Sequence, residues 1–154
     1  MFTVSDIAAI IKRPEEDIQD AVTRVRNWTK ERLLKPEGQL NPGTGRARLY
    51  SAASVESAVL LQMLTDAAGM KAVAIAPQLG DAQQELEFAR KQLKKPNAEP
   101  FFLILMRSTG EDEWQMASSP LSKLLPILSR RPADTYTMID LGRIIERIDA
   151  KRSN

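Results

Sequence analysis

The stretch RVRNWTKERLLKPEGQLNPGTGRARLY, residues 24–50, decides how the N-terminal half of this chain is expected to fold. It begins as the end of an amphipathic helix and finishes as a short basic strand. Turn-forming residues are dense between these two segments: Pro36, Gly38, Pro42, Gly43 and Gly45. Such a density between ordered segments predicts a hairpin loop. A helix followed by a hairpin is the outline of a winged helix.

Two arginines, Arg46 and Arg48, lie at the end of the predicted hairpin. Residues two apart in an extended strand point to the same face, so both guanidinium groups can meet a phosphate backbone or a narrow groove. The alternative is a charged loop that contacts only solvent, and charge alone favours that alternative.

Two motifs in this stretch resemble the N-terminal DNA-binding domain of the MerR family of transcription regulators. VRNWTKERLL resembles the end of that family's recognition helix, and GRARLYS resembles the close of its wing. The start of the chain, residues 3–8, resembles the start of the same domain, and the likeness covers roughly residues 2–79. The matching residues are Val25, Arg26, Trp28, Glu31, Leu33 and Leu34 in the first motif, and Gly45, Arg46, Arg48, Tyr50 and Ser51 in the second.

The composition limits the chemistry that the chain can perform. Its 154 residues include no cysteine and no histidine, which excludes disulfides, thiolate metal sites and catalytic triads that need either residue. We expect no cofactor, no metal site and no enzymatic activity. The net charge of +2 permits nucleic-acid binding without arguing for it. The absence of a long apolar run or a signal-peptide pattern predicts a cytoplasmic protein that does not enter a membrane.

The first two helices have clear start signals. Thr3 and Asp6 form the pattern of a capping box at the start of the first helix. Pro14 suits the first position of the second helix, and residues 15–17 then place three acids in its first turn. The second helix is therefore expected to be one to two turns longer than in the MerR family. Acids at that end would repel phosphates, although they match the helix dipole.

The expected DNA contacts lie in the turn between the first two helices, in the second helix and in the wing. Trp28 is expected in the core. Backbone contacts are expected from Arg24, Arg26, Lys30, Arg46 and Arg48. Base contacts are assigned to Gln19, Thr23 and Asn27, and further contacts to Lys12, Arg13 and Tyr50.

The middle of the chain contains two further helices. Ser51 is expected to cap a helix that Gly69 ends. After Gly80, residues 81–95 form a helix whose apolar residues recur at four-three-four spacing: Ala82, Leu86, Ala89 and Leu93. This stripe suits an antiparallel dimer seam of the kind used by MerR relatives, and it equally suits packing on its own chain.

A boundary is expected at residues 94–100, which contain two prolines and few apolar groups. Beyond it, residues 101–106 read as a buried strand and residues 114–117 as its antiparallel partner. A short helix over residues 120–128, a strand over 136–139 and a final amphipathic helix complete a ββαβα unit. About fifty residues make a marginal domain, so this unit should pack on the first domain or on a second copy of itself.

The predicted fold is α+β, with three parts. Residues 1–80 form a MerR-like winged helix-turn-helix, residues 81–95 a connecting or dimerisation helix, and residues 96–154 a small α/β domain for dimerisation or an effector. The resemblance implies a homodimeric transcription regulator on a palindromic DNA operator, with RNA polymerase as a further partner. Two alternatives remain: an architectural DNA-binding factor for recombination, and a protein-interaction module that does not bind DNA.

Overall fold

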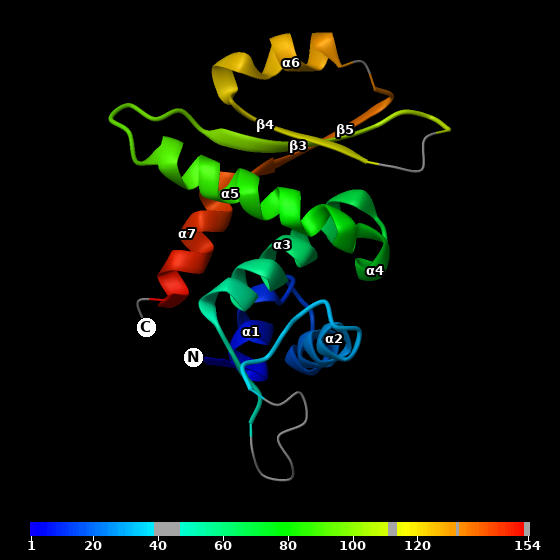
Figure 1. Cartoon of the computed structure of the whole chain (residues 1–154), viewed down its shortest axis with the longest axis vertical. Helices are drawn as coiled ribbons and strands as arrows, with labels where there is room; N and C mark the ends of the chain where they lie inside the picture. Colours follow the sequence, from blue (N-terminus) through cyan, green and yellow to red (C-terminus); the bar gives the residue numbers. More distant parts are fainter. Residues whose placement is uncertain (39–46, 111–113, 132, 153–154) are drawn as a thin grey trace.

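The computed structural model describes residues 1–38, 47–110, 114–131 and 133–152, with the backbone alone for residues 151 and 152. It is a mixed α+β fold with two small antiparallel sheets (Figure 1). The helices are α1 (Val4–Ile11), α2 (Ile18–Lys30), α3 (Ala52–Ala68), α4 (Ala72–Ile75), η1 (Ala76–Gln78), α5 (Leu79–Leu93), η2 (Leu121–Lys123), α6 (Leu124–Arg130) and α7 (Leu141–Arg152). The strands are β1 (Phe2–Thr3), β2 (Leu49–Tyr50), β3 (Phe101–Arg107), β4 (Gln115–Pro120) and β5 (Thr135–Asp140).

Helix α1 begins as predicted, but α2 does not. Thr3 and Asp6 form both hydrogen bonds of the capping box, which holds the pKa of Asp6 below its usual value, chiefly through its bond from the Thr3 backbone N–H. The predicted start of α2 at Pro14 is wrong, because Asp17 is the N-cap and the first helical residue is Ile18. Glu15 has φ of +62°, in the left-handed region, so the acidic run is a turn before the helix.

The predicted hairpin is described only at its base. Glu37 and Leu49 form an antiparallel bridge, in which the backbone N–H of Glu37 donates to the carbonyl of Leu49 at 2.7 Å. On its other side, β2 pairs antiparallel with β1, a strand that the sequence analysis did not anticipate. Residues 39–46, which include Arg46, lie outside the described residues.

Helix α3 begins and ends where predicted, whereas α5 begins earlier. The side chain of Ser51 accepts a hydrogen bond at the N-terminus of α3, and Gly69 closes the helix with φ of +64°. The predicted start at residue 81 is two residues late, because η1 runs directly into α5 and Gly80 lies inside that helix. The backbone N–H groups at this start need no side-chain cap where one helical segment continues into the next.

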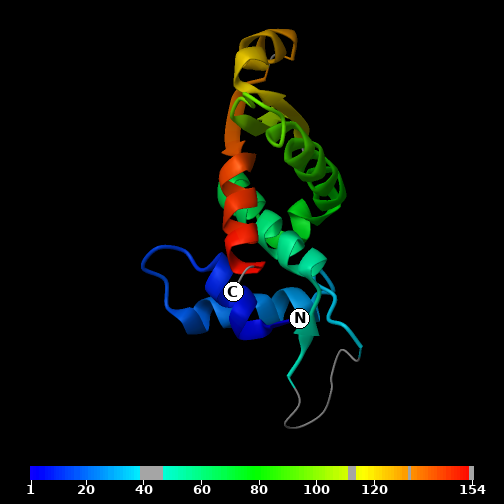
Figure 2. The same cartoon turned by 90° about the vertical axis from the view of Figure 1, so that its left-hand side faces the viewer.

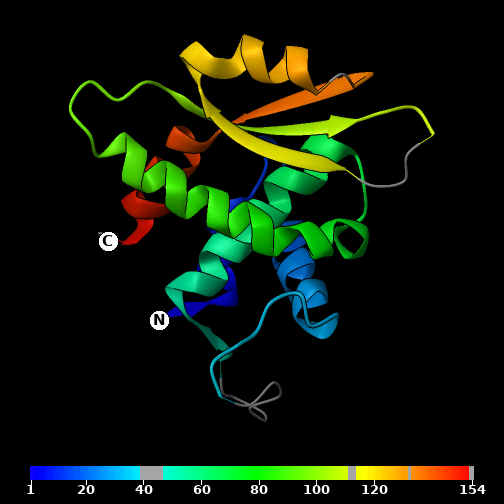
Figure 3. The same cartoon turned by 45° about the horizontal axis from the view of Figure 1, so that its top comes forward.

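The C-terminal unit has the predicted ββαβα order. Its sheet has the order β4-β3-β5, with both outer strands antiparallel to β3. Figure 3 shows α6 on one face of this sheet and α5 on the other. Strand β3 is buried on both faces, with Leu103 and Leu105 in one apolar cluster and Ile104 and Met106 in another. Burial on both faces explains why β3 is a continuous apolar run rather than an alternating one.

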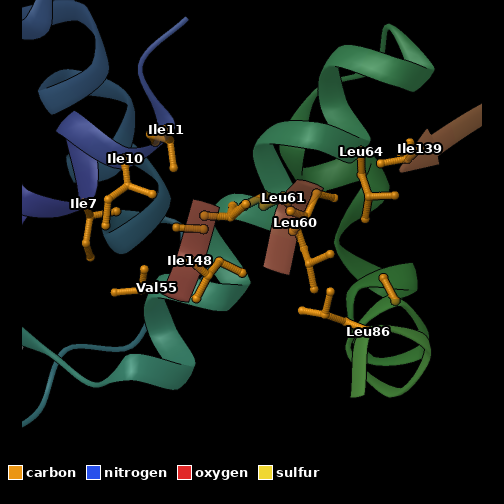
Figure 4. Close-up of a cluster of buried hydrophobic side chains, with 14 of the residues drawn as sticks. Ile7, Ile10, Ile11, Val55, Leu60, Leu61, Leu64, Leu86, Ile139 and Ile148 are labelled. Atoms are coloured by element: carbon orange, nitrogen blue, oxygen red, sulfur yellow. The ribbon is translucent and has the colours of Figure 1, made fainter. Parts of the chain in front are cut away.

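The apolar core continues across the boundary expected at residues 94–100. Helix α7 returns from the C-terminal unit and contacts α1, α3 and α5 (Figure 2). Figure 4 shows side chains of α1, α3, α5 and α7 in one cluster, among them Ile7, Leu61, Leu86 and Ile148. The C-terminal unit thus packs on the N-terminal half of its own chain, the first of the two alternatives. A unit of that size leaves much apolar surface to cover.

The stripe of α5 also packs within the chain. Ala82, Leu86 and Ala89 are buried, and Leu93 packs against the same core. Helix α5 contacts α3, α7, β3 and β4. The apolar stripe of α5 therefore packs on its own chain, which was one of the two alternatives. These residues do not form an exposed dimer seam.

Candidate nucleic-acid interface

Helix α2 has one buried face and one polar face. Its buried residues are Ala21, Val22, Val25, Trp28 and Thr29, and the expectation that Trp28 lies in the core is confirmed. Residues three, four, seven and eight positions apart share one face of a helix. The exposed side chains at such spacing are Gln19, Thr23, Arg26, Asn27 and Lys30. We call these five residues the α2 polar face.

The α2 polar face has two cations, and one exposed acid, Asp20, adjoins it, three residues from Thr23 and seven from Asn27. Arg26 and Lys30 are four residues apart, so their side chains emerge on adjacent turns. Neither forms an ion pair within the described part of the chain. Asp20 lies at the edge of this face, in the first turn of α2, where the helix dipole favours an acid. The positive charge of the face is therefore concentrated toward its C-terminal end.

Arg24, which was expected to contact the DNA backbone, is bonded within the protein. Its two terminal nitrogens donate to the two carboxylate oxygens of Glu16 at 2.5 and 2.8 Å, and its guanidinium lies 5.9 Å from the centre of the Trp28 ring. The bonds from Arg24, with a further one from the Arg13 backbone N–H, lower the pKa of Glu16 to about 2. Arg24 thus anchors the acidic turn to α2.

Arg13 has a similar internal role. Its guanidinium donates to Oδ1 of Asp66 in α3 at 2.5 and 3.0 Å, and this bond raises the pKa of Arg13. The other oxygen of Asp66 accepts from Gln62 at 2.6 Å. Lys12 is half-buried, and its backbone carbonyl accepts from Arg147. The expected contacts in the first turn therefore hold the turn against α3 and α7.

Tyr50 is not part of the surface. Its side chain is fully buried, and its hydroxyl lies 2.7 Å from Oγ1 of Thr29. The expectation that Tyr50 contacts DNA is wrong for this fold, because β2 turns the ring into the core against α2. Arg48 is half-buried just before β2.

Lys71 is a cation beside the α2 polar face that sequence reasoning missed. It is exposed and precedes α4. A groove of about 380 Å³ lies between α2 and this segment, and its lining includes Thr23, Asn27 and Lys71 together with two acids, Asp20 and Glu31. Periodicity could not identify Lys71, because it stands alone in a turn and reaches α2 only through the tertiary fold.

No three acidic side chains in the described ranges converge to hold a metal ion, and the acidic cluster at residues 111–113 lies outside those ranges. No protein-family model matches the chain, and no curated protein is similar to it in sequence.

Taken singly, none of the described helices is long and apolar enough to cross a membrane. Only α3 joined to Ala72–Leu93, across a bend of 103°, has that length and composition.

Proposed function

We propose that this protein is a transcription regulator that binds double-stranded DNA through the α2 polar face. The proposal includes a MerR-like winged helix-turn-helix in residues 1–80, with α2 in the major groove and the segment before β2 on the adjacent backbone. The observation that supports it most is the α2 polar face itself, five exposed polar side chains of which two are cations. A recognition helix needs such a face, since base edges are read by amides and hydroxyls and phosphates by cations.

The acids at residues 15–17 were expected to repel DNA phosphates from the start of the second helix. Their contacts in the fold weaken that objection. Glu16 is bound by Arg24, and Asp17 accepts from the backbone N–H of Gln19 as the N-cap. Asp20 remains at the edge of the α2 polar face, and Glu15 remains exposed in the turn before the helix, without an ion pair in the described ranges. The negative charge that would repel phosphates is therefore partly neutralised.

The proposed active form is a homodimer on a palindromic operator. Two-fold symmetry would place the two α2 helices in successive major grooves, with half-sites about 34–36 Å apart or a multiple of that distance. Because the α5 stripe is used within the chain, the dimer contact would come from another surface. Contact with RNA polymerase belongs to this proposal only as an implication of the MerR resemblance.

Binding to random duplex DNA across a salt series, with sedimentation of the free protein, tests this function. We expect a dimer whose affinity falls steeply as salt rises, because bound cations release counterions from the phosphates. Affinity that does not depend on salt, or no binding at low salt, would contradict the proposal. Selection of an operator from a random library would then separate a regulator from an architectural factor that binds without sequence preference.

A second candidate is a protein-interaction module without DNA binding. It is supported by two apolar side chains on the outer side of η2 and α6, Leu121 and Leu125, which are 52% and 76% exposed. Neighbouring exposed leucines at helical spacing are typical of a contact surface. This function predicts no salt-dependent DNA affinity, so the same salt series distinguishes the two candidates.

A further inference from the structure

Strand β4 lies at one edge of the three-stranded sheet, with no strand of the described chain on its outer side. Figure 3 shows β4, in yellow, in front of the other two strands, with α6 above it and α5 below it. A groove of about 700 Å³ lies between these three elements. Residues 116–118 of β4 line it, together with Phe88 of α5 and with Arg130 and Arg131 of α6. We call it the β4-edge groove.

The β4-edge groove is lined by both faces of the strand, so it opens at the edge of the sheet. Met116 packs with the apolar cluster on the α5 side of the sheet, whereas Ala117 packs with the cluster on the α6 side. Both residues line the groove. Because neighbouring residues of a strand point to opposite faces, a strand added at this edge would place its side chains alternately against α5 and α6.

The backbone of β4 directs hydrogen-bonding groups into this groove. The N–H of Leu121 donates to the carbonyl of Pro100 at 3.0 Å, which continues the ladder between β3 and β4 by one pair. Bonded pairs alternate along an antiparallel ladder, so residues 115, 117 and 119 bond to β3. Met116 and Ser118 therefore point their N–H and C=O groups outward. An extended peptide uses such groups to add a strand to a sheet edge.

The α6 side of the groove is positively charged. Arg130 and Arg131 are exposed, and neither forms an ion pair within the described part of the chain. One acid, Glu85 of α5, also lines the groove, and it accepts a hydrogen bond from the hydroxyl of Ser118. Two cations against one carboxylate leave one positive charge, on the α6 side. A guanidinium binds a carboxylate through charge-assisted hydrogen bonds, so a partner strand should present acids to α6.

The α5 side of the groove is apolar around Phe88. The side chain of Phe88 is 48% exposed, and its ring packs edge-on against Phe101 with the ring centres 5.7 Å apart. Met116 is half-buried on the same side and adds a flexible apolar chain. A partner strand should therefore present apolar side chains to α5. Together, the two sides of the groove match a strand in which acidic and apolar residues alternate.

A single extended segment suits this edge better than a second copy of the chain. Antiparallel pairing of two β4 strands about a two-fold axis would bring each of α5 and α6 toward the same helix of the other copy. The arginines of α6 would then approach the same arginines, and like charges repel. A peptide strand brings no helices and can supply the missing negative charge.

We propose that the β4-edge groove binds an extended acidic segment of a partner protein, which adds a fourth strand to the sheet. The backbone of this segment pairs with Met116 and Ser118. Its acidic side chains meet Arg130 and Arg131, and its apolar side chains lie on Phe88. This binding is independent of the proposed DNA binding, because no residue of α2 lines the groove.

Hydrogen exchange in the full chain, labelled with nitrogen-15, tests the site with a capped octapeptide of alternating glutamate and valine. In the free protein, the N–H groups of Met116 and Ser118 should exchange about tenfold faster or more than that of Ala117, which is bonded to β3. Saturating peptide should slow both by about tenfold or more. Equal exchange of the three groups in the free protein would overturn the proposal, as would the absence of saturable binding or of slowed exchange.

N-methylated peptides test whether the bound segment is a strand. An edge strand directs alternate N–H groups toward its neighbour, so methylation of one alternate set should abolish binding and methylation of the other should spare it. In an antiparallel strand the valines are the sensitive set, because residues in a bonded pair share a face with Met116 and Ser118. In a parallel strand the glutamates are sensitive. Equal affinities of the two methylated peptides would contradict strand addition.

Two comparisons test the role of charge. A peptide with lysine in place of glutamate should bind about tenfold more weakly or worse. Arg130→Ala/Arg131→Ala should lose about tenfold or more in affinity for the glutamate peptide and remain folded, since both side chains are exposed. Lys35→Ala/Arg143→Ala is the matched control, because it removes two exposed cations outside the groove. Equal affinity for the two peptides, or an equal effect of the two double variants, would refute the charge complementarity and the proposal with it.

Sedimentation of the free protein distinguishes the proposed peptide site from pairing of two copies. We expect the N–H groups of Met116 and Ser118 to exchange rapidly without peptide, whether the chain is a monomer or a dimer through another surface. A dimer in which both groups are protected without peptide would assign the edge to a second copy and overturn the proposal.

Discussion

The guanidinium of Arg24 and the carboxylate of Glu16 face each other with two parallel hydrogen bonds, 2.5 and 2.8 Å long. This pair joins the turn before α2 to the second turn of the helix. Both side chains are largely shielded, with 17% and 11% of their surfaces exposed. Paired guanidinium–carboxylate bonds in such a setting are stronger than exposed ion pairs. The start of α2 therefore depends on the ionised state of Glu16.

Acid should destabilise the protein through this pair. The pKa of Glu16 is about 2 in the fold, lowered from 4.5 mainly by Arg24. A lowered pKa in the folded state stabilises the fold at pH above 4.5, and that stabilisation is lost as the pH falls from 4.5 toward 2. We expect Glu16 to contribute about 2 kcal/mol to the free energy of unfolding, less than the full shift because solvent reaches the pair. Urea unfolding between pH 2 and pH 7 measures it.

The neighbouring acid Glu15 provides the control for the urea unfolding series. Glu16→Gln should lower stability at pH 7 and flatten the pH dependence between 4.5 and 2. Glu15 is adjacent and exposed, and it forms no ion pair within the described ranges. Glu15→Gln should therefore leave the pH dependence in place. Equal curves for Glu16→Gln and the wild type would show that the pair does not stabilise the fold.

The buried hydroxyl pair of Tyr50 and Thr29 gives a second prediction. Thr29 donates to the carbonyl of Val25 at 2.9 Å, so the Tyr50 hydroxyl must donate to Thr29. Tyr50→Phe removes that donor and should cost about 1 kcal/mol of unfolding free energy. Thr29→Val instead leaves a buried Tyr50 hydroxyl without an acceptor and should cost about 1–3 kcal/mol. Adding Tyr50→Phe to Thr29→Val should recover part of that loss. Additive costs would contradict a stabilising hydrogen bond between the two hydroxyls.

Unfolding should be cooperative across the two halves of the chain. The buried Trp28 lies in the N-terminal half, and Trp114 lies just before β4 with its indole N–H donating to Met70. The continuous core predicts that single-tryptophan variants, Trp28→Phe and Trp114→Phe, report the same urea midpoint as far-ultraviolet circular dichroism. Ile148→Ala opens a cavity in α7 and should cost about 2–5 kcal/mol. It should shift both fluorescence transitions together; a shift confined to Trp114 would indicate two independent units.

Local signals in the sequence predicted which helices and strands form better than they predicted the first residue of each. Thr3 and Asp6 predicted α1 because a capping box involves only neighbours in the chain, and the apolar run at residues 101–106 predicted β3. The start of α2 was misplaced because Pro14 and Asp17 both suit a helix start. In the fold, α2 begins later, at Ile18, and the acidic turn before it makes its own contacts, above all the bond between Glu16 and Arg24. Hydrophobic periodicity cannot reveal such contacts.

Only the part of the candidate interface that lies on helix α2 could be predicted from the sequence. Gln19, Thr23, Arg26, Asn27 and Lys30 follow from the spacing of the buried positions in α2, and all five are exposed. Arg13 and Tyr50 could not be assigned correctly, because their partners, Asp66 and Thr29, are distant in the chain. Lys71 was missed for the same reason. Charge in the sequence does not reveal which cations already have an internal partner.

The central claim, that the α2 polar face binds DNA, is tested most directly by the salt dependence of one double variant. Arg26→Ala/Lys30→Ala removes two exposed cations from α2 without touching its core. If both contact phosphates in each protomer of the proposed homodimer, four contacts are lost, so the slope of log affinity against log salt should fall by about four, with weaker binding to any duplex. Arg130→Ala, on α6 at the other end of the molecule (Figure 1), should leave the slope unchanged. A slope equal to that of the wild type in Arg26→Ala/Lys30→Ala would contradict the claim.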